Sequence, residues 1–319
     1  MNNVRRRRFL LAALTAPLVT LAQGATKLYR IGVLAAGSLK SLRQSLADLG
    51  LVEGRDFVLE IRDPQGRLER LDALTEELVR LNVDVIIASN PRAVSSAKRS
   101  TTTIPIVMMH SPDPVQLGFV ASLARPGGNI TGVTTLSADL SAKQLELLKE
   151  AVPRVSRVAL VWNPDNLWHP ATVRALHGHS SAMGLALQAL AVSSPEGFDG
   201  AFQAMATERA QALLVLADPM TYFHRQRLAD LAIRHRLPMM GSLPEYAEAG
   251  SLLSYWADTD DVYRRVASYV DRILKGAKPR DLPVEQPTKF ELLANLKTAK
   301  ALGIAIPQSV LLRANRVIE

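Results

Sequence analysis

The sequence predicts an α/β protein with two similar lobes, each built on a parallel sheet flanked by helices. Short apolar runs alternate with longer segments of helical period, and this alternation passes through two successive sets. The 319 residues are 48% hydrophobic and 21% charged, which is enough apolar material for two domains of ordinary size. Several apolar runs also end in the same kind of polar turn, as the strands of an open parallel sheet do where they approach a site.

The predicted strands are short, apolar and bounded by turn-forming residues. They are Tyr29–Leu34, Phe57–Ile61, Val83–Ala88, Ile104–Met109, Arg157–Val161, Ala186–Ala191, Ala212–Leu216, Met239–Met240 and Leu252–Tyr255. Helical spacing of apolar residues predicts helices over 68–81 and around 145–152. A later helix can be capped by Asp258 or Thr259 and ended by Gly276.

The N-terminus has the pattern of an export signal. Arg5–Arg8 precede the apolar run Phe9–Ala22, and small residues follow around Ala22–Ala25. The run is too short to span a bilayer as a helix, so residues 1–24 are predicted to be a signal peptide and the mature protein to be periplasmic. Arg6–Leu10 also matches the twin-arginine pattern, which leaves the export route open, and an ordinary buried N-terminal helix is the alternative.

Charge and cysteine content exclude several classes of function. The formal net charge is +8, and Arg5–Arg8 supply four of those charges, which leaves +4 for the rest. The remaining Lys and Arg residues are scattered, so no nucleic-acid partner is expected. With no cysteine in the chain, disulfides and thiol catalysis are excluded.

Motifs for catalysis or cofactor binding are not recognisable. The chain has no Gly-x-Ser-x-Gly elbow, P-loop or dinucleotide fingerprint, so no cofactor is expected. His177 and His179 would point about 200° apart on a helix, so no metal pair is expected there. His110 ends a predicted strand but has no identifiable Ser–Asp partners, while His169 and His224, like His235, are expected at the surface.

The strand-end turns are the candidate site. Polar residues follow five predicted strands, in the turns Ser89-Asn90, His110–Asp113, Trp162–Asp165, Ala217-Asp218 and Gly241-Ser242. Ligands of open parallel sheets bind outside the carboxyl ends of the strands, so two facing lobes would line one cleft with these residues. The alternative is that each residue only makes a turn or caps a helix.

Long segments of the sequence resemble the substrate-binding proteins of ABC importers, which have the type I periplasmic binding protein fold. The matching segments are Leu49–Gly54 with Glu60–Arg62, Ile104–Val107, Asp113–Val115, Val120–Gly132, Lys143–Glu150, Tyr269–Gly276, Leu282–Glu291 and Asn295–Gly303. The resemblance covers the chain from Leu28 to Glu319.

The resemblance implies two Rossmann-like lobes joined by three hinge crossings. The first lobe would take residues 27–135 plus 257–282, and the second 136–256 plus 283–319. Crossings are expected near 125–134, near 253–258 and near 281–287, with Gly127, Gly128 and Gly132 giving the first its freedom.

The same resemblance implies which residues bind the ligand. Candidate contacts come from both lobes and one crossing: Ala36, Ser38, Ser89, Asn90, His110, Asp113, Trp162, Asn163, Asp218, Ser242, Tyr255 and Trp256. Asp113 or Asp218 would hold a ligand ammonium, and Ser89, Asn90 and helix N-termini its carboxylate. Trp162, Tyr255 and Trp256 would supply an apolar face.

These observations predict a function without catalysis. The chain is expected to be an exported, monomeric solute-binding protein that captures a small organic solute, such as an amino acid or aromatic compound, and delivers it to an ABC permease of the inner membrane. The alternatives are a ligand-sensing protein for a receptor and a small-molecule enzyme on the same fold. Two departures from the family bear on specificity: a short first loop at Ala35–Ser41 and a bulky Trp256 where the family has glycine.

Overall fold

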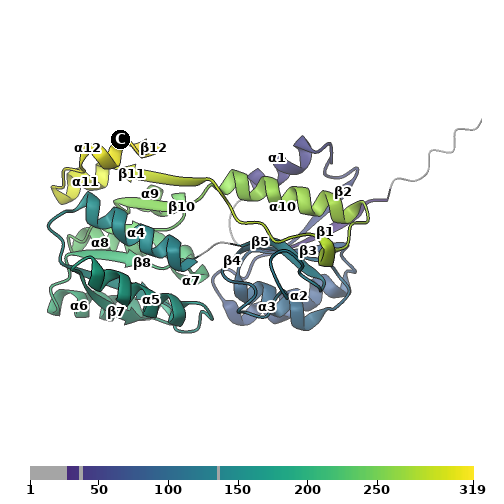
Figure 1. The fold of residues 1–319 in the computed structure, drawn as a ribbon, viewed down its shortest axis with the longest axis horizontal. Helices are drawn as coiled ribbons and strands as arrows, with labels where there is room; N and C mark the ends of the chain where they lie inside the picture. The colour runs from purple at the N-terminus through teal and green to yellow at the C-terminus, as the bar shows by residue number, and fades with distance from the viewer. Residues whose placement is uncertain (1–26, 36–38, 135–136) are drawn as a thin grey trace, which may run out of the picture.

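The computed structural model describes residues 27–35, 39–134 and 137–319, with the side chains of 137 and 138 left out. The predicted signal peptide and the candidate residues Ala36 and Ser38 lie outside these residues. Two lobes lie side by side, each with a central sheet (Figure 1). The predicted α/β fold with two mostly parallel sheets is therefore confirmed.

The first sheet has the strand order β2-β1-β3-β4-β5, and every pair in it is parallel. Its strands are β1 (Tyr29–Leu34), β2 (Phe57–Arg62), β3 (Val85–Ala88), β4 (Ile106–Ser111) and β5 (Ile130–Thr134). Helices α1 (Lys40–Asp48) and α10 (Thr259–Leu274) cover one face, and α2 (Leu71–Arg80) with α3 (Pro91–Ser100) the other. The central strand β3 is apolar throughout, and β1 and β4 are apolar over most of their length, because both faces of the sheet are buried there.

The second sheet has the order β12-β11-β10-β9-β8-β6-β7, parallel except where β10 pairs with β11. Its strands are β6 (Arg157–Trp162), β7 (Ala186–Ala191), β8 (Ala212–Val215), β9 (Met239–Gly241), β10 (Leu253–Ala257), β11 (Phe290–Asn295) and β12 (Arg316–Ile318).

Helices also cover both faces of the second sheet. One face packs against α4 (Ser137–Ala151), α5 (His169–Ala182) and α12 (Gln308–Leu311). The other packs against α6 (Phe198–Thr207), α8 (Arg225–Arg234) and α9 (Pro244–Ala249). Short helices α7 (Pro219–Phe223) and α11 (Leu296–Leu302) follow β8 and β11, and single turns η1 (Leu68–Arg70), η2 (Pro195–Gly197) and η3 (Pro279–Asp281) join other elements.

The chain passes three times between the sheets (Figure 1). It leaves the first sheet after β5, returns from β10 into α10, and leaves again through the segment before β11. The first and third passages lie together, because Thr134 donates its backbone N–H to the carbonyl of Glu285 at 2.9 Å. Below, the first lobe means the first sheet with α1–α3 and α10, and the second lobe the second sheet with its helices.

Strand β5 was missed by the sequence prediction, which placed a hinge over 125–134. The strand is hidden by Gly132, because a glycine also suits the flexible backbone of a hinge. In the structure this glycine has a φ of +132°. A Cβ at this position would lie 2.2 Å from the carbonyl oxygen of Met108 in the neighbouring strand. Gly132 therefore serves the close approach of β5 to β4, as glycine often does within sheets.

The other predicted elements agree with the structure to within a few residues. All nine predicted strands are present, whereas β11 and the three-residue β12 were also missed. Asp258 caps α10 by accepting a hydrogen bond from the backbone N–H of Asp261 at 2.8 Å. Among the described residues, no helix combines the length and apolar character needed to cross a membrane.

Candidate functional site

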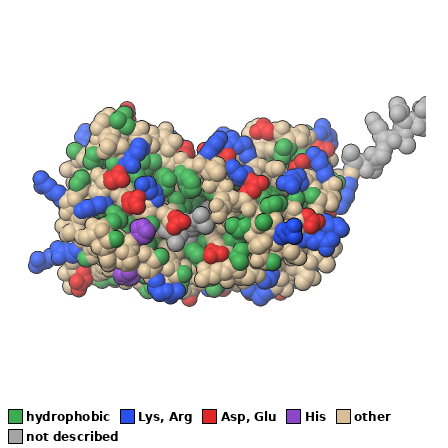
Figure 2. Space-filling view, viewed as in Figure 1, with side chains coloured by type: hydrophobic (Ala, Val, Ile, Leu, Met, Phe, Trp, Pro, Cys, Tyr) green, Lys and Arg blue, Asp and Glu red, His purple; other side chains and the backbone are tan. Residues whose placement is uncertain are grey.

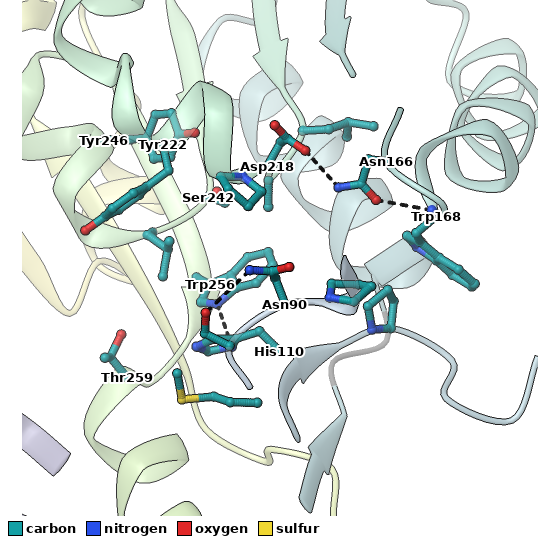
Figure 3. A pocket seen from close by; sticks show the side chains of 18 of the residues that line it. Asn90, His110, Asn166, Trp168, Asp218, Tyr222, Ser242, Tyr246, Trp256 and Thr259 are labelled. Atoms are coloured by element: carbon teal, nitrogen blue, oxygen red, sulfur yellow. Dashed lines mark hydrogen bonds between the residues drawn. The ribbon is translucent and has the colours of Figure 1, made fainter. Parts of the chain in front are cut away.

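A cavity of about 260 Å³ lies between the lobes, where the carboxyl ends of strands from both sheets meet. The first lobe contributes Ser89, Asn90 and His110 to its lining, and the second lobe contributes Asp218, Ser242 and Trp256 (Figure 3). This volume is near the lower end of the usual range for small-molecule sites, roughly 300–1,000 Å³. The cavity therefore suits a small solute.

Asp218 stands at the end of β8 and caps α7. Its Oδ1 accepts hydrogen bonds from the backbone N–H of Met220 at 2.9 Å and from Nδ2 of Asn163 at 3.2 Å. Its Oδ2 accepts one from Nδ2 of Asn166 at 2.9 Å (Figure 3). Only 4% of Asp218 is exposed, so this carboxylate is largely satisfied by the protein itself.

His169 lies in the same wall, and the expectation that it is a surface residue is wrong. It is 3% exposed; its Nδ1 accepts from the backbone N–H of Asn163 at 2.9 Å, and its Nε2 lies 3.1 Å from the carbonyl oxygen of Ala217. Burial lowers the pKa of His169 although the nearby Asp218 charge acts in the opposite direction. His169 is therefore a neutral ring that ties the turn after β6 to the end of β8.

His110 and Trp256 meet in the cavity from opposite lobes. His110 has a φ of +55°, beside a register shift between β4 and β5, and its Nδ1 accepts a hydrogen bond from Nε1 of Trp256 at 3.4 Å. Burial lowers the pKa of His110 to about 4, which leaves the ring neutral at neutral pH.

Asn90 both caps helix α3 and lines the cavity. Its Oδ1 accepts from the backbone N–H of Ala93 at 3.0 Å and so caps α3, while the residue also lines the cavity. The N-terminus of this ten-residue helix thus lies at the cavity, where it favours negative charge.

Several polar atoms of residues that line the cavity are buried and have no hydrogen-bond partner among the described residues. They are Nε1 of Trp168, Oγ of Ser242, Oε2 of Glu245 and Oγ1 of Thr259. Buried polar groups are nearly always paired, so unpaired ones gathered at one cavity indicate a place for a polar ligand or water. Figure 3 shows three of these residues, Trp168, Ser242 and Thr259, around the space between the lobes.

The charge of the described lining is negative. Asp218 and Glu245 belong to it, whereas none of its described residues is Lys or Arg. On the face shown in Figure 2, Lys and Arg side chains are instead spread over both lobes, with Asp and Glu among them. Nor do the described residues contain a group of three or more His, Cys, Asp or Glu side chains that could hold a metal ion.

The structure brings six of the predicted contacts to the cavity, namely Ser89, Asn90, His110, Asp218, Ser242 and Trp256. It places four others, Asp113, Trp162, Asn163 and Tyr255, outside the lining of this cavity. What the ligand touches stays a prediction for all of them.

Local geometry explains the four residues outside the lining. Asp113 caps a turn by accepting from the backbone N–H of Gln116 at 3.0 Å, and Asn163 lies behind Asp218. Trp162 packs against the apolar cluster beneath α4 and α5. Tyr255 alternates with Trp256 along β10 and stacks on Phe290 beside a second, smaller pocket, because neighbouring strand residues point to opposite faces.

Sequence analysis missed several lining residues, among them Trp168, His169, Tyr222, Glu245 and Tyr246. Each belongs to the first helical turns after a strand-end turn that the prediction did identify. Extending each predicted turn by one helical turn would have included them. The polar turn marks where the strand ends, while the side chains that reach the cavity also come from the helix that follows.

Comparison with known proteins identifies a family and several relatives. Residues 36–318 match the family described as "ABC transporter substrate binding protein". The tyrosine-binding protein of Clostridioides difficile (strain R20291) is 24% identical over 266 residues, which is 83% of this chain and 76% of that protein.

Two solved structures are similar over nearly the whole chain. A conserved domain protein from Vibrio cholerae O1 biovar El Tor is 27% identical, with a TM-score of 0.84 and coverage of 91% of this chain and 100% of the other. An ABC domain from Streptococcus pneumoniae in complex with L-Trp is 25% identical, with a TM-score of 0.84 and coverage of 92% and 100%. The predicted type I periplasmic binding protein fold is thereby confirmed.

Proposed function

The chain belongs to the family of ABC transporter substrate-binding proteins, and on that premise we propose that it captures an aromatic amino acid or a close analogue. The observation that carries this proposal is the small cavity between the lobes, which is lined from both sides by residues that include buried polar atoms without a partner in the described part of the chain. The names of two similar proteins agree with the ligand class, since one is tyrosine-binding and the other is in complex with L-Trp.

The lining has the features that an aromatic amino acid requires. Trp168, Trp256 and Tyr222 offer aromatic surface for a ring. Two carboxylates are available as acceptors for an ammonium group, and Ser89, Asn90 and the N-terminus of α3 can receive a carboxylate. No step of catalysis is proposed.

The wider role follows from the family and the sequence. The predicted signal peptide of residues 1–24 would export the chain, and a permease in the inner membrane would receive the solute from the monomeric protein. Closure of the lobes around the solute would stabilise the bound state through contacts made only when closed. One contact that joins the lobes in this structure supports the proposal: Nη2 of Arg92 donates to the carbonyl oxygen of Asp165 at 3.0 Å.

Ligand screening by thermal unfolding tests the proposal. Residues 25–319 would be unfolded and refolded to remove any bound solute and then mixed with single L-amino acids, aromatic acids, nucleobases and sugars. A ligand at about 100 times its dissociation constant adds roughly 2.7 kcal/mol, which raises the unfolding midpoint by a few degrees.

The expected result is a shift with L-tyrosine or L-tryptophan, confirmed by calorimetric titration, with the compound recovered unchanged. A shift only with sugars or nucleobases would refute the proposed ligand class. Conversion of the compound into a product would refute a pure binding function.

A further inference from the structure

We propose that Glu245, and not Asp218, binds the positively charged amino group of the solute, and this proposal rests on the proposed function. The two carboxylates of the cavity differ in how much of their hydrogen-bonding capacity the protein uses. Asp218 accepts three hydrogen bonds, from Met220, Asn163 and Asn166. An ionised carboxylate offers about four acceptor positions, so Asp218 has roughly one left.

Glu245 has most of its acceptor capacity free. It lies in the first turn of α9, where its Oε1 accepts a hydrogen bond from the hydroxyl of Tyr222 at 3.3 Å. Its Oε2 is buried and has no partner among the described residues. Burial and the neighbouring Glu245 charge raise the pKa of Tyr222 to about 12, so Tyr222 remains a donor at neutral pH.

The described lining gives Glu245 no positive partner, and the nearby Arg225, outside this lining, stacks on the ring of Tyr222 and donates to its carbonyl oxygen instead. That lining contains neither Lys nor Arg, and burial keeps its histidines, His110 and His169, neutral. Glu245 is partly exposed, but its Oε2 is buried, and burying part of an ionised carboxylate without a counter-charge is unfavourable. A ligand ammonium group would supply the missing charge and hydrogen bonds.

The position of Glu245 would also couple binding to contact between the lobes. Glu245 and Tyr222 belong to the second lobe, whereas Thr259 and Tyr263 of α10 line the cavity from the first. Burial raises the pKa of Tyr263 to about 12, and the charge of Glu245 contributes to this shift, so the carboxylate acts across the gap. An ammonium bound there has three N–H donors, and Oγ1 of Thr259 is a further unpartnered acceptor in the same cavity.

A purely structural role for Glu245 does not explain these contacts. Acidic residues are common in the first turn of helices because they bind free backbone N–H groups or oppose the helix dipole. Among the residues that the structure describes, the carboxylate of Glu245 has a hydrogen bond with the side chain of Tyr222 alone, and α9 has only six residues. The carboxylate therefore leaves its own helix uncapped, and one of its oxygens is buried without a partner among the described residues, on a residue that lines the cavity.

The proposal predicts selection by charge. A solute with an amino group should bind whether or not it carries a carboxylate, and a solute with the carboxylate alone should be excluded. L-Tyrosine, tyramine and 3-(4-hydroxyphenyl)propanoate form a matched set, because they share the phenol ring and differ only in these two groups.

Calorimetric titration of the mature chain with these three compounds tests the proposal. The variants are Glu245→Gln and, as a control, Glu248→Gln on the same helix, where Glu248 is half-exposed and paired with Arg316 away from the cavity. The wild type should bind L-tyrosine and tyramine but not the propanoate. Glu245→Gln should weaken both amines at least about thirtyfold, the low end for removing one partner of a buried charge pair, and Glu248→Gln should match the wild type.

Thermal unfolding without ligand gives a second readout. Removing a charge that has no counter-charge in the lining, while the amide oxygen can still accept from Tyr222, should leave the midpoint of Glu245→Gln unchanged or raise it, whereas a structural Glu245 would make this variant less stable. Equal affinity of Glu245→Gln and wild type for the amines, or tight binding of the propanoate, would overturn the proposal while the function stands. Failure of the wild type to bind L-tyrosine, L-tryptophan and tyramine would overturn both.

Discussion

The indole N–H of Trp256, in the second sheet, donates a hydrogen bond of 3.4 Å to Nδ1 of His110, at the end of β4 in the first sheet. The two rings lie 5.9 Å apart between centroids, and both residues line the cavity. This pair therefore joins the lobes at the place where a solute would bind.

Replacing Trp256 with Phe should destabilise the protein by about 1–2 kcal/mol, because Nδ1 of His110 would lose its donor. Differential scanning calorimetry would measure this as a lower unfolding midpoint. The matched control is Trp162→Phe, since Nε1 of Trp162 has no partner among the described residues and its removal costs no hydrogen bond to them. If the control loses as much stability as Trp256→Phe, the loss comes from the packing of the indole ring and not from the hydrogen bond.

Acid should destabilise the folded protein through His110. The pKa of His110 is lowered from 6.5 to about 4, so the unfolded chain takes up a proton at a higher pH than the folded one. The free energy of unfolding is therefore unaffected by His110 above pH 6.5 and decreases as the pH falls from 6.5 towards 4. The decrease is at most about 3 kcal/mol, at roughly 1.4 kcal/mol per pH unit. Urea unfolding at neutral pH and near pH 4.5 would measure the difference.

His110→Asn is the control for this pH dependence. Asparagine tolerates the left-handed conformation of position 110, where φ is +55°, but does not titrate. The variant should lose less stability on acidification than the wild type, with a residual loss from His169, whose pKa burial also lowers. An identical pH dependence in the two proteins would show that His110 is not the group that titrates.

Asp218→Ala should lower the free energy of unfolding by about 2–4 kcal/mol. The substitution removes the cap of α7 and leaves the buried amides of Asn163 and Asn166 without their acceptor. Asp199→Ala is the control, because Asp199 forms an exposed pair with Arg227, worth at most about 1 kcal/mol. If Asp218→Ala changes the free energy of unfolding little but greatly weakens ligand binding, Asp218 and not Glu245 would be the residue that binds the ammonium group.

The sequence was sufficient to predict most of the fold for a physical reason. Strands buried on both faces form uninterrupted apolar runs, as in Val85–Ala88, and such runs stand out between segments of helical period. Strand β5 was not predicted because it contains Gly132, and glycine is typical of flexible turns. The structure shows that glycine is needed there because the backbone of Met108 is too close for a side chain. From the sequence alone, a glycine that is needed for its backbone flexibility cannot be told from one that is needed for its small size.

The candidate site was predictable in position but only partly in its residues. Strand-end turns located Asp218 and Ser242, since parallel strands end at one edge of a sheet. Glu245 was missed because an acidic residue in the first turn of a helix is usual without any ligand. Only the structure shows that one oxygen of Glu245 has no partner in the described part of the chain, and that most of the hydrogen-bond acceptor positions of Asp218 are occupied.

Contacts between the lobes at the edge of the cavity should control how slowly a solute leaves. Gly66, in the loop after β2, lies against Phe223 at the end of α7: a Cβ at Gly66 would be 3.2 Å from Cγ of the ring. Phe223 is nevertheless 49% exposed, and its ring also lies 5.1 Å from that of His224, so its loss should leave the buried core intact.

Phe223→Ala should therefore raise the dissociation rate of L-tyrosine several-fold with little change in its association rate, as most changes at an interface act on dissociation. Stopped-flow fluorescence is suited to this measurement because Trp168 and Trp256 line the cavity. Leu312→Ala, at the exposed end of α12 on the second lobe, should leave both rates unchanged. If Phe223→Ala has the same rates as the wild type, contact with Gly66 does not hold the lobes together, and the pair Arg92–Asp165 would be the next contact to remove.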